Sequence, residues 1–424
     1  MPEPTENPAT PESFSPRATT VDAVRCGRLV DVRAGIVRDD VVLVLDGERV
    51  AAVQAGDVPL PSDATVLDLS DCTVAPGLID LHTHLVGAIE GGSYAEILTK
   101  SEADEALVGV KHARDTLRAG FTSVRDVGTF RAFADVALKR GIEAGWFEGP
   151  RMLCAGAYVT TDGGGGGVTG FAHDIELPRS LRYGVSNGVD EVRHNVRLLL
   201  GGGADFIKVI ATGAVLAPGT TPGAPEFSED EIRAAVDEAA LYDTFVAAHA
   251  HGAEGIKRAV RAGVRSVEHG SIADEEALQL MAEAGTYLVA DVWNGDWIAE
   301  TGRREGWPAA TLQKNSDTTE TQRTAFSRAV DLGVRIAFGT DSGVYPHGMN
   351  ARQLPVMVRL GLSPMNTLRA ATLWAAECMD DDAVGSLEAG RYADLVAVGG
   401  RDLGDLSGFA EDVRVVVKGG RVVR

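Results

Sequence analysis

The sequence predicts an α/β protein in which a (β/α)8 TIM barrel carries a small β-sandwich domain built from both termini. Two observations predict this fold. Residues 21–75 and 383–424 are rich in short apolar runs such as VVLVLDG and VRVVVKGG, whereas residues 76–382 alternate such runs with helical stretches such as SEDEIRAAVDEAALY. Alternating strands and helices are typical of a parallel barrel, and β-rich ends are typical of a module completed by both ends of the chain.

Residues 1–20, which precede the first of these runs, are rich in Pro, Thr, Ser and Glu. We expect a disordered tail there, because so few apolar side chains cannot support a core. The tail lacks a basic start followed by an apolar segment, so no secretory signal is predicted. No stretch approaches the roughly 20 uninterrupted apolar residues that a membrane span requires, and we expect a soluble, cytoplasmic protein without a membrane partner.

The middle segment contains short apolar runs that end at glycine or at polar residues. This pattern is typical of buried parallel strands that stop at a loop. In a (β/α)8 barrel the active site lies where the strands end. The expected strands are 78–82, 122–126, 152–155, 206–210, 245–249, 265–269, 287–291 and 334–339.

Two histidines, His82 and His84, stand two positions apart at the end of the first expected strand, in PGLIDLHTHL. Residues i and i+2 of a strand point to the same side, so both imidazoles can converge on one ion. Because imidazole is a preferred ligand of zinc-like ions, the pair is a candidate metal site. The alternative is two polar residues at a strand end that water satisfies.

Four further strand ends carry polar residues: Lys208 in ADFIKVIATG, His249 in TFVAAHAHG, His269 in VRSVEHGS and Asp341 after VRIAFGT. Lys208 is unusual, because a buried ammonium costs several kcal/mol unless it is paired or neutralised. One interpretation is a lysine that extends to water at the strand end. The other is a lysine carboxylated by carbon dioxide, whose new carboxylate bridges two metal ions.

These motifs resemble those of the amidohydrolase superfamily, in its binuclear-metal group with a carboxylated lysine. Within it, IKVIATGAVLAPGTTPGAPEFSEDEI, VAAHAHGAEGI and VEHGS are similar to the branch of Xaa-Pro-type dipeptidases and related amino-acid carboxypeptidases, often called imidazolonepropionase-like. The resemblance covers essentially the whole chain after residue 20. It implies a metal-ligand set, matched residue by residue: His82, His84, Lys208, His249, His269 and Asp341.

The resemblance also implies a mechanism. Two divalent ions, zinc given the imidazole and oxygen ligands, would be bridged by carboxylated Lys208 and by a hydroxide that attacks the scissile carbonyl. Asp341 would also move a proton from water to the leaving nitrogen. The reaction would be hydrolysis of a C–N amide bond. One ion would be held by His82, His84 and Asp341, and the other by His249 and His269.

The branch resemblance implies a dipeptide or an N-acyl amino acid with a free carboxylate as the substrate. Alternatives are a cyclic amide or imidazolone hydrolase, or a deaminase, on the same barrel. Relatives of those kinds generally use a mononuclear site without the strand-four lysine, so Lys208 argues against them. A non-catalytic scaffold that has lost its metal is disfavoured, because the implied ligand set is complete.

His251 lies two positions beyond His249 and therefore on the same face. In the resembling branch this position carries Tyr or His and faces the substrate, which implies a catalytic contact with the carbonyl or the carboxylate; an incidental loop imidazole is the alternative. Relatives also carry a histidine in a Gly-rich loop after the third strand, where this chain reads TTDGGGGGVTG. Gly165 and Gly166 there are candidates for a backbone cradle, a mobile lid is the alternative, and His173 is a candidate substitute for the missing imidazole.

Further polar residues carry weaker signals. Arg182, Tyr183 and His347 are candidate substrate contacts, the first two through a free carboxylate. Arg125 and Asp126, at the end of the second strand, fit either a layer that supports the metal ligands or a salt bridge at the barrel rim. Two other histidines, His112 and His194, lie in helical stretches and are expected on the outer surface.

The 424 residues include 40 Lys and Arg against 61 Asp and Glu, a formal charge of −21. This charge disfavours nucleic acid and anionic membranes as partners. The expected partners are a small-molecule amide or dipeptide substrate and further copies of the chain in a homo-oligomer. No zinc knuckle is offered by the scattered cysteines, which are expected to be reduced core residues: Cys26, Cys72, Cys154 and Cys378.

Overall fold

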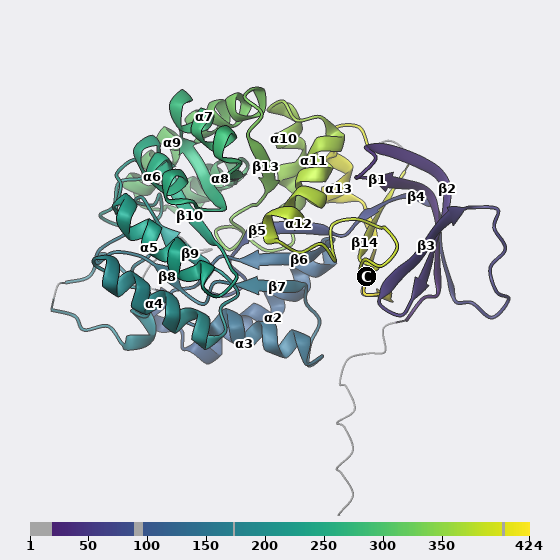
Figure 1. The fold of residues 1–424 in the computed structure, drawn as a ribbon, viewed down its shortest axis with the longest axis horizontal. Helices are drawn as coiled ribbons and strands as arrows, with labels where there is room; N and C mark the ends of the chain where they lie inside the picture. Colours follow the sequence, from purple (N-terminus) through teal and green to yellow (C-terminus); the bar gives the residue numbers. More distant parts are fainter. Residues whose placement is uncertain (1–18, 89–95, 173, 401–402) are drawn as a thin grey trace, which may run out of the picture.

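Both ends of the chain form one mixed sheet of seven strands, which lies beside the barrel (Figure 1). The computed structural model describes residues 19–88, 96–172, 174–400 and 403–424. The order across this sheet is β16-β15-β14-β4-β1-β2-β3. Its strands are β1 (Ala23–Asp31), β2 (Ile36–Asp46), β3 (Arg49–Ala55), β4 (Val66–Pro76), β14 (Leu395–Gly399), β15 (Val413–Lys418) and β16 (Arg421–Val422).

This sheet has an apolar interior of its own, to which both ends of the chain contribute. Leu29 from β1 packs in one cluster with Leu395 from β14 and Val417 from β15. An isolated bridge between Thr20 and Arg421 joins the two ends again. The predicted small β domain built from both termini is confirmed, and its seven strands are hydrogen-bonded into a single sheet.

Parallel strands form the barrel, and each expected strand is present. Two short strands stand at the third position of the barrel. The first, β7, pairs with β6, and the second, β8, follows after a short break and pairs with β9. The ring closes where the Asp341 N–H donates to the His82 carbonyl, at 2.8 Å, and the His84 N–H donates to the Ser342 carbonyl, at 2.8 Å. The strands are β5 (Leu78–Thr83), β6 (Phe121–Asp126), β7 (Arg151–Cys154), β8 (Tyr158–Val159), β9 (Ile207–Ile210), β10 (Val246–Gly252), β11 (Ser266–Ile272), β12 (Tyr287–Ala290) and β13 (Arg335–Phe338).

Helices alternate with these strands and surround the barrel (Figure 1). Ser101 and Ser228 begin two of them with capping boxes, in which serine and the acidic residue three positions on satisfy each other's backbone N–H groups. The helices are α1 (Glu96–Thr99), α2 (Glu102–Arg118), α3 (Ala134–Glu143), α4 (Val189–Gly202), α5 (Glu229–Ala240), α6 (Ala253–Ala262), α7 (Glu275–Ala284), α8 (Asn294–Glu305), α9 (Ala309–Asp331), α10 (Leu354–Arg359), α11 (Pro364–Ala370), α12 (Leu373–Met379) and α13 (Ser407–Glu411), with 3-10 turns η1 (Arg179–Leu181) and η2 (Asn350–Gln353).

A single residue, Gly77, connects the sheet strand β4 to the first barrel strand β5. Its N–H donates to the carbonyl of Asp394, at 2.8 Å, so the carboxy-terminal segment fixes this junction. The side chain of Thr122 occupies the space that a Cβ at this position would need. Glycine therefore allows the close approach that places His82 at the end of β5.

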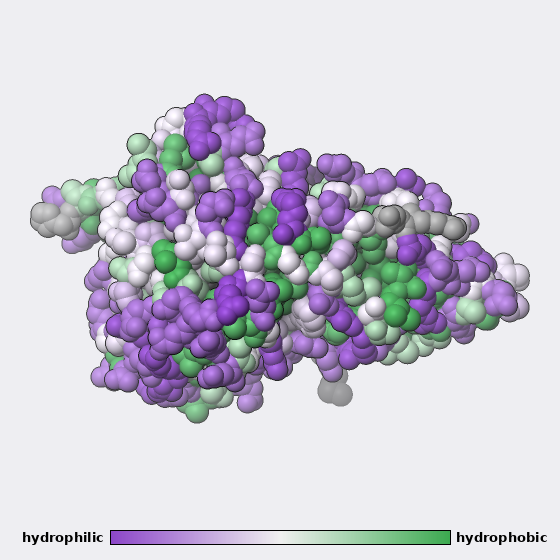
Figure 2. All heavy atoms as spheres, turned by 90° about the horizontal axis from the view of Figure 1, so that it is seen from above, coloured by the Kyte–Doolittle hydropathy of each residue, from purple (hydrophilic) through white to green (hydrophobic). Residues whose placement is uncertain are grey.

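Most of the expected tail, residues 1–20, falls outside the described residues. The four cysteines are free and buried, as predicted. No helix in the described part of the chain combines the length and the apolar character needed to cross a bilayer. Figure 2 shows that hydrophilic side chains cover most of the face seen from above, with smaller apolar areas between them.

Candidate active site

The barrel strands bring the predicted metal ligands to one pocket at their carboxyl ends. Parallel strands of a barrel end at the same rim, so residues far apart in the sequence meet there. All members of the predicted set line this pocket: His82 in β5 and His84 just beyond it, Lys208 in β9, His249 in β10, His269 in β11 and Asp341 after β13.

His82, His84 and Asp341 form one group that can hold a cation. The Asp341 Oδ1 atom lies 3.1 Å from His84 Nε2 and 3.5 Å from His82 Nε2. One ligand atom from each residue falls within 4.8 Å of the others. This group corresponds to the first predicted ion site.

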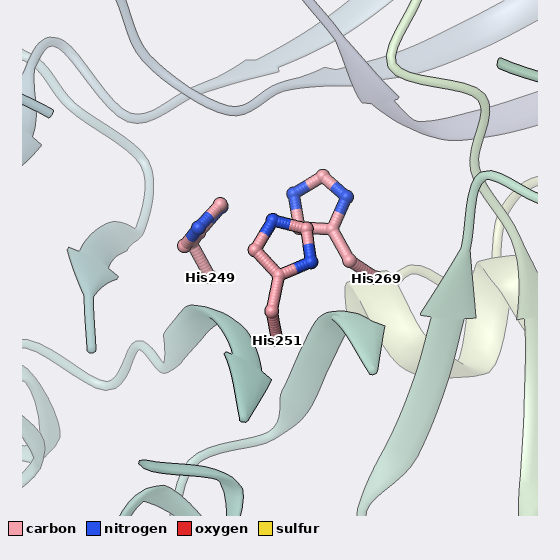
Figure 3. Close-up of side chains that lie close together, drawn as sticks. All are labelled: His249, His251 and His269. Atoms are coloured by element: carbon pink, nitrogen blue, oxygen red, sulfur yellow. The ribbon is translucent and has the colours of Figure 1, made fainter. Parts of the chain in front are cut away.

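His249, His251 and His269 form a second group, shown in Figure 3. The ring centroid of His249 lies 4.6 Å from that of His251 and 4.6 Å from that of His269. The rings of His251 and His269 are stacked, with centroids 4.7 Å apart. His251 is thus packed against both predicted ligands of the second ion.

A hydrogen bond to one ring nitrogen fixes the tautomer of each predicted imidazole ligand. Because carbonyl and carboxylate oxygens accept and do not donate, the bonded nitrogen carries the proton, and the other nitrogen has a lone pair for a cation. The residues therefore fit a metal site. The bonds run from His82 Nδ1 to Glu268 (3.0 Å), from His84 Nδ1 to the Gly128 carbonyl (3.0 Å), from His249 Nε2 to the Gly213 carbonyl (3.3 Å) and from His269 Nδ1 to Asp291 (2.9 Å).

Burial and neighbouring charges together shift the pKa values of these groups. Burial lowers the pKa of His82 well below the ordinary value, and the charge of Lys208 adds to the effect, so this imidazole is neutral, as a ligand must be. Burial likewise lowers the pKa of Lys208 to about 8. For His269, burial would lower the pKa, but the negative charge of Asp291 outweighs it and raises the pKa.

Asp291, at the end of the seventh expected strand, is a site residue that the sequence analysis does not single out. Its Oδ1 accepts from His269 Nδ1 and, at 2.7 Å, from Gln322 Nε2 of α9. It is buried and lines the pocket. An acidic residue directly after the apolar run TYLVA was the available signal, the same kind that identifies Asp341.

Glu268 is a second residue that was not predicted, and it pairs with Arg125 inside the barrel. Arg125 Nη2 donates to Glu268 Oε1 at 2.6 Å, and both side chains have 0% exposure. The rim salt bridge considered for Arg125 is therefore wrong, because this guanidinium lies in the barrel interior. The other interpretation, a layer that supports the predicted ligands, agrees with its contact to Glu268. Glu268 Oε2 accepts from His82, so the pair supports a predicted ligand. An acid within the apolar run RSVEHG was a signal of the same kind as Lys208.

The glycine-rich loop contributes Gly165 and Gly166 to the pocket wall. Their N–H groups are already bonded within the protein, to the Glu226 carboxylate at 2.9 Å and to Thr160 Oγ1 at 3.2 Å. The expected backbone cradle is therefore wrong for these two groups. A Cβ on Gly166 would collide with Ile210 of β9, which explains the glycine there. His173 lies outside the described residues.

The other candidate substrate contacts are placed differently. His251 lines the pocket, and its Nδ1 lies 2.8 Å from Ser271 Oγ. Arg182 lies away from the pocket and pairs with Asp162 at 2.7 Å, while Tyr183 packs on Phe133. Neither is among the described residues that line the pocket, so their predicted role in gripping a carboxylate is not supported by their position.

His347 supports the site from behind instead of lining it. Its Nε2 donates to the His84 carbonyl at 3.1 Å, and its ring stacks on His112 with centroids 4.4 Å apart. The expectation that His112 lies on the surface is wrong, because its side chain is buried and bonded to the Leu85 carbonyl. His194 is exposed, as expected.

The pocket lining also contains apolar side chains, called here the apolar wall. Phe130, Leu216, Ile298 and Val344 line it, and Trp307 packs behind Ile298 and Val344. Among the described lining residues there is no arginine, and Lys208 is the only lysine. The same pocket can therefore hold a cation and also contact an apolar group of a substrate.

The pattern of the amidohydrolase family matches residues 73–423, which include every ligand of the predicted set. The chain belongs to the amidohydrolase family. This amidohydrolase is 33% identical to the ochratoxinase of Aspergillus niger over 377 residues, covering 82% of this chain and 75% of the ochratoxinase. It is 27% identical to the imidazolonepropionase of Deinococcus radiodurans over 402 residues, covering 88% of this chain and 87% of that protein.

Solved structures of similar proteins agree with this family assignment. A Xaa-Pro dipeptidase with methionine bound in its active site superimposes with a TM-score of 0.89 and 36% identity, covering 94% of this chain and 98% of that one. A prolidase complexed with N-methylphosphonate-L-proline superimposes with a TM-score of 0.87 and 32% identity, covering 96% and 100%. The amidohydrolase is thus a hydrolase that acts on amide or related C–N bonds, and its predicted barrel is confirmed.

Proposed function

We propose that this amidohydrolase cleaves the amide bond of a dipeptide or of an N-acyl amino acid. The observation that carries the proposal is the meeting of two cation-binding groups, around His84 and around His269, in one pocket with Lys208. The similarity to a Xaa-Pro dipeptidase and to an ochratoxinase supports it. A homo-oligomer and a cytoplasmic location remain predictions.

The residues proposed to hold the cations are the predicted set. Divalent ions such as zinc, when bound, supply Lewis acidity that acidifies water and polarises a carbonyl. Lys208 is buried between groups that carry both signs of charge: Glu268 and Asp341 raise its pKa, and Arg125 lowers it. Burial lowers this pKa overall to about 8, so a larger share of the amine is neutral and able to react. We propose that the neutral amine forms a bond to the carbon of carbon dioxide and releases a proton, and that the resulting carboxylate would supply oxygen ligands for the cations.

Asp341 is the proposed acid and base. One oxygen of its carboxylate takes a proton from the attacking water, whose oxygen forms the new bond to the carbonyl carbon. The C–N bond breaks, and the same carboxylate delivers the proton to the leaving nitrogen. His251, packed against His249 and His269, is proposed to contact the carbonyl or the free carboxylate of the substrate.

The apolar wall favours a substrate with a bulky apolar group. The wall includes Phe130, Leu216 and Ile298. Contact between these side chains and an apolar substrate group removes apolar surface from water, which makes the free energy of binding more favourable. Ring opening of a cyclic amide or imidazolone is the second candidate, because an imidazolonepropionase is among the relatives. Lys208 within the ligand cluster favours the dipeptide or N-acyl amino acid substrate.

Two measurements test the proposal. Metal analysis of protein made with added metal and bicarbonate is expected to find about two divalent ions per chain. A library of dipeptides and N-acyl amino acids, assayed beside lactams, imidazolones and aminopurines, is expected to show activity on the first group. A count of one ion or none per chain would reject the proposed bridging role of Lys208. Turnover of only lactams, imidazolones or aminopurines would reject the dipeptidase assignment.

A further inference from the structure

Asn294, the first residue of α8, lies between the two carboxylates of the site. Its Nδ2 atom donates to Asp341 Oδ2 and to Asp291 Oδ2, each at 3.1 Å. The residue is 4% exposed and lines the pocket. Both hydrogens of one amide nitrogen are therefore used to bridge two acidic side chains.

The two carboxylates dictate which way this amide points. Carboxylate oxygens accept hydrogen bonds, so turning the Asn294 amide over would set its own oxygen against them. The observed orientation leaves Asn294 Oδ1 buried without a hydrogen-bond partner among the described residues. An unpaired buried acceptor is unfavourable, and the bonds to Asp291 and Asp341 are maintained despite it.

The bridge gives the two oxygens of Asp341 different surroundings. Oδ2 is held by Asn294, while Oδ1 lies 3.1 Å from His84 Nε2. The backbone of Asp341 has a φ of 59°, in the left-handed region, where a residue other than glycine is strained and must be held by its surroundings. The backbone N–H of Asp341 donates to the His82 carbonyl at 2.8 Å, and Asn294 holds its carboxylate.

The same bridge connects the two groups that could hold a cation. On its other side, Asp291 Oδ1 accepts from His269 Nδ1 at 2.9 Å. A continuous series of hydrogen bonds therefore runs from His269 through Asp291 and Asn294 to Asp341. Because Asp291 and Asp341 carry like charges, a neutral double donor between them reduces their repulsion.

We propose that Asn294 is a positioning residue for the hydrolysis proposed above. Its amide fixes the Asp341 carboxylate in the orientation from which that carboxylate takes the proton of water and delivers it to the leaving nitrogen. It also keeps Asp291 bonded to His269. Asn294 acts through Asp341, so this inference rests on the proposed function of Asp341.

The test compares Asn294→Ala, which removes the amide, with Asn294→Asp, which keeps its shape but cannot donate to two carboxylates. Asn195→Ala is the matched control. Asn195 is also a buried asparagine, and its amide donates to the Val185 carbonyl and to Ser186 Oγ, at 2.9 Å each, in a region away from the pocket. All variants are compared by thermal unfolding, metal content, kcat and KM.

Both Asn294 variants are expected to lose about 10- to 100-fold in kcat while KM changes by less than about threefold. The loss is expected to be larger on a substrate with a poor leaving amine than on an activated anilide, which needs less proton donation. A variant at Asn294 with the kcat of the wild type would overturn the proposal, and so would an equal loss on both substrates.

A second readout does not depend on activity. The visible spectrum of the cobalt-substituted protein reports the surroundings of the bound ion, and we expect it to change in both Asn294 variants and not in Asn195→Ala. If the wild type hydrolyses no amide, the proposed function fails, and the spectrum still decides whether Asn294 positions Asp341. Spectra identical to that of the wild type in both Asn294 variants would reject the positioning role.

Discussion

Arg125 donates to Glu268 across the closed interior of the barrel, from strand β6 to strand β11, over 2.6 Å. Ser266 Oγ donates to the same Glu268 oxygen, and Arg125 Nε donates to the Leu81 carbonyl at 2.7 Å. A buried ion pair is tolerated only when further hydrogen bonds satisfy both charges, as they do here. The second oxygen of Glu268 binds His82, which connects the barrel core to the site.

Glu268→Ala is expected to lower the free energy of unfolding by about 3–5 kcal/mol, because it leaves the Arg125 charge buried without a partner. Urea unfolding of the metal-free protein measures this. Glu388→Ala is the control. It breaks the exposed pair with Arg33 and the contacts of Glu388 with Arg391 and Ser386, and it should cost about 0–1 kcal/mol. Equal losses in the two variants would contradict a special role for the interior pair.

Lys208→Ala is expected to lose metal and turnover together, because the proposed bridging oxygens are gone. Elemental analysis and a rate assay measure both. Short carboxylic acids such as acetate are expected to restore part of the activity by replacing the missing group. The wild type treated with acetate serves as the control, and a Lys208→Ala protein with full activity would make this lysine an ordinary strand residue.

Asp341→Asn is expected to lose turnover by orders of magnitude while it keeps much of its metal. An amide oxygen can still bind a cation, but an amide cannot carry a proton between water and the leaving nitrogen. Metal content and kcat of the same preparation separate the two effects. Substantial kcat in this variant would remove Asp341 from the acid and base role.

His251→Ala is expected to keep both ions and to lose about 1–3 kcal/mol of transition-state stabilisation, the scale of one lost hydrogen bond to a charged or carbonyl group. The measurement is kcat/KM on a substrate with a free carboxylate and on its amide. A larger loss on the carboxylate substrate indicates that His251 binds that group, and an equal loss indicates the scissile carbonyl. No change on either substrate would make His251 incidental.

The alternation of strands and helices predicted the barrel, because hydrophobic periodicity depends on neighbours a few positions apart. The same local rule identified His82 and His84, which share one side of a strand end, and it identified Lys208 and Asp341 as polar residues at the ends of apolar runs. Since all strands of a parallel barrel end at one rim, placing these residues on strand ends was enough to predict that they meet.

The partners of buried charges could not be predicted in this way. Arg125 and Glu268 are 143 positions apart, and only the closure of the barrel brings β6 within reach of β11. The N–H of Gly165 bonds to Glu226 in a later loop, so a segment that looked free to bind a substrate is engaged by the protein itself.

The sequence by itself determined the barrel and the β domain completed by both termini, because each depends on local periodicity and on the common direction of the strands. The set of metal ligands is what the family resemblance implies, and it stays a prediction. The tertiary structure decided which nitrogen of each imidazole is free, that Asp291 holds His269, and that Asn294 bridges Asp291 and Asp341. These facts depend on distances of about 3 Å between side chains from different strands and helices, and no local pattern in a sequence encodes such distances.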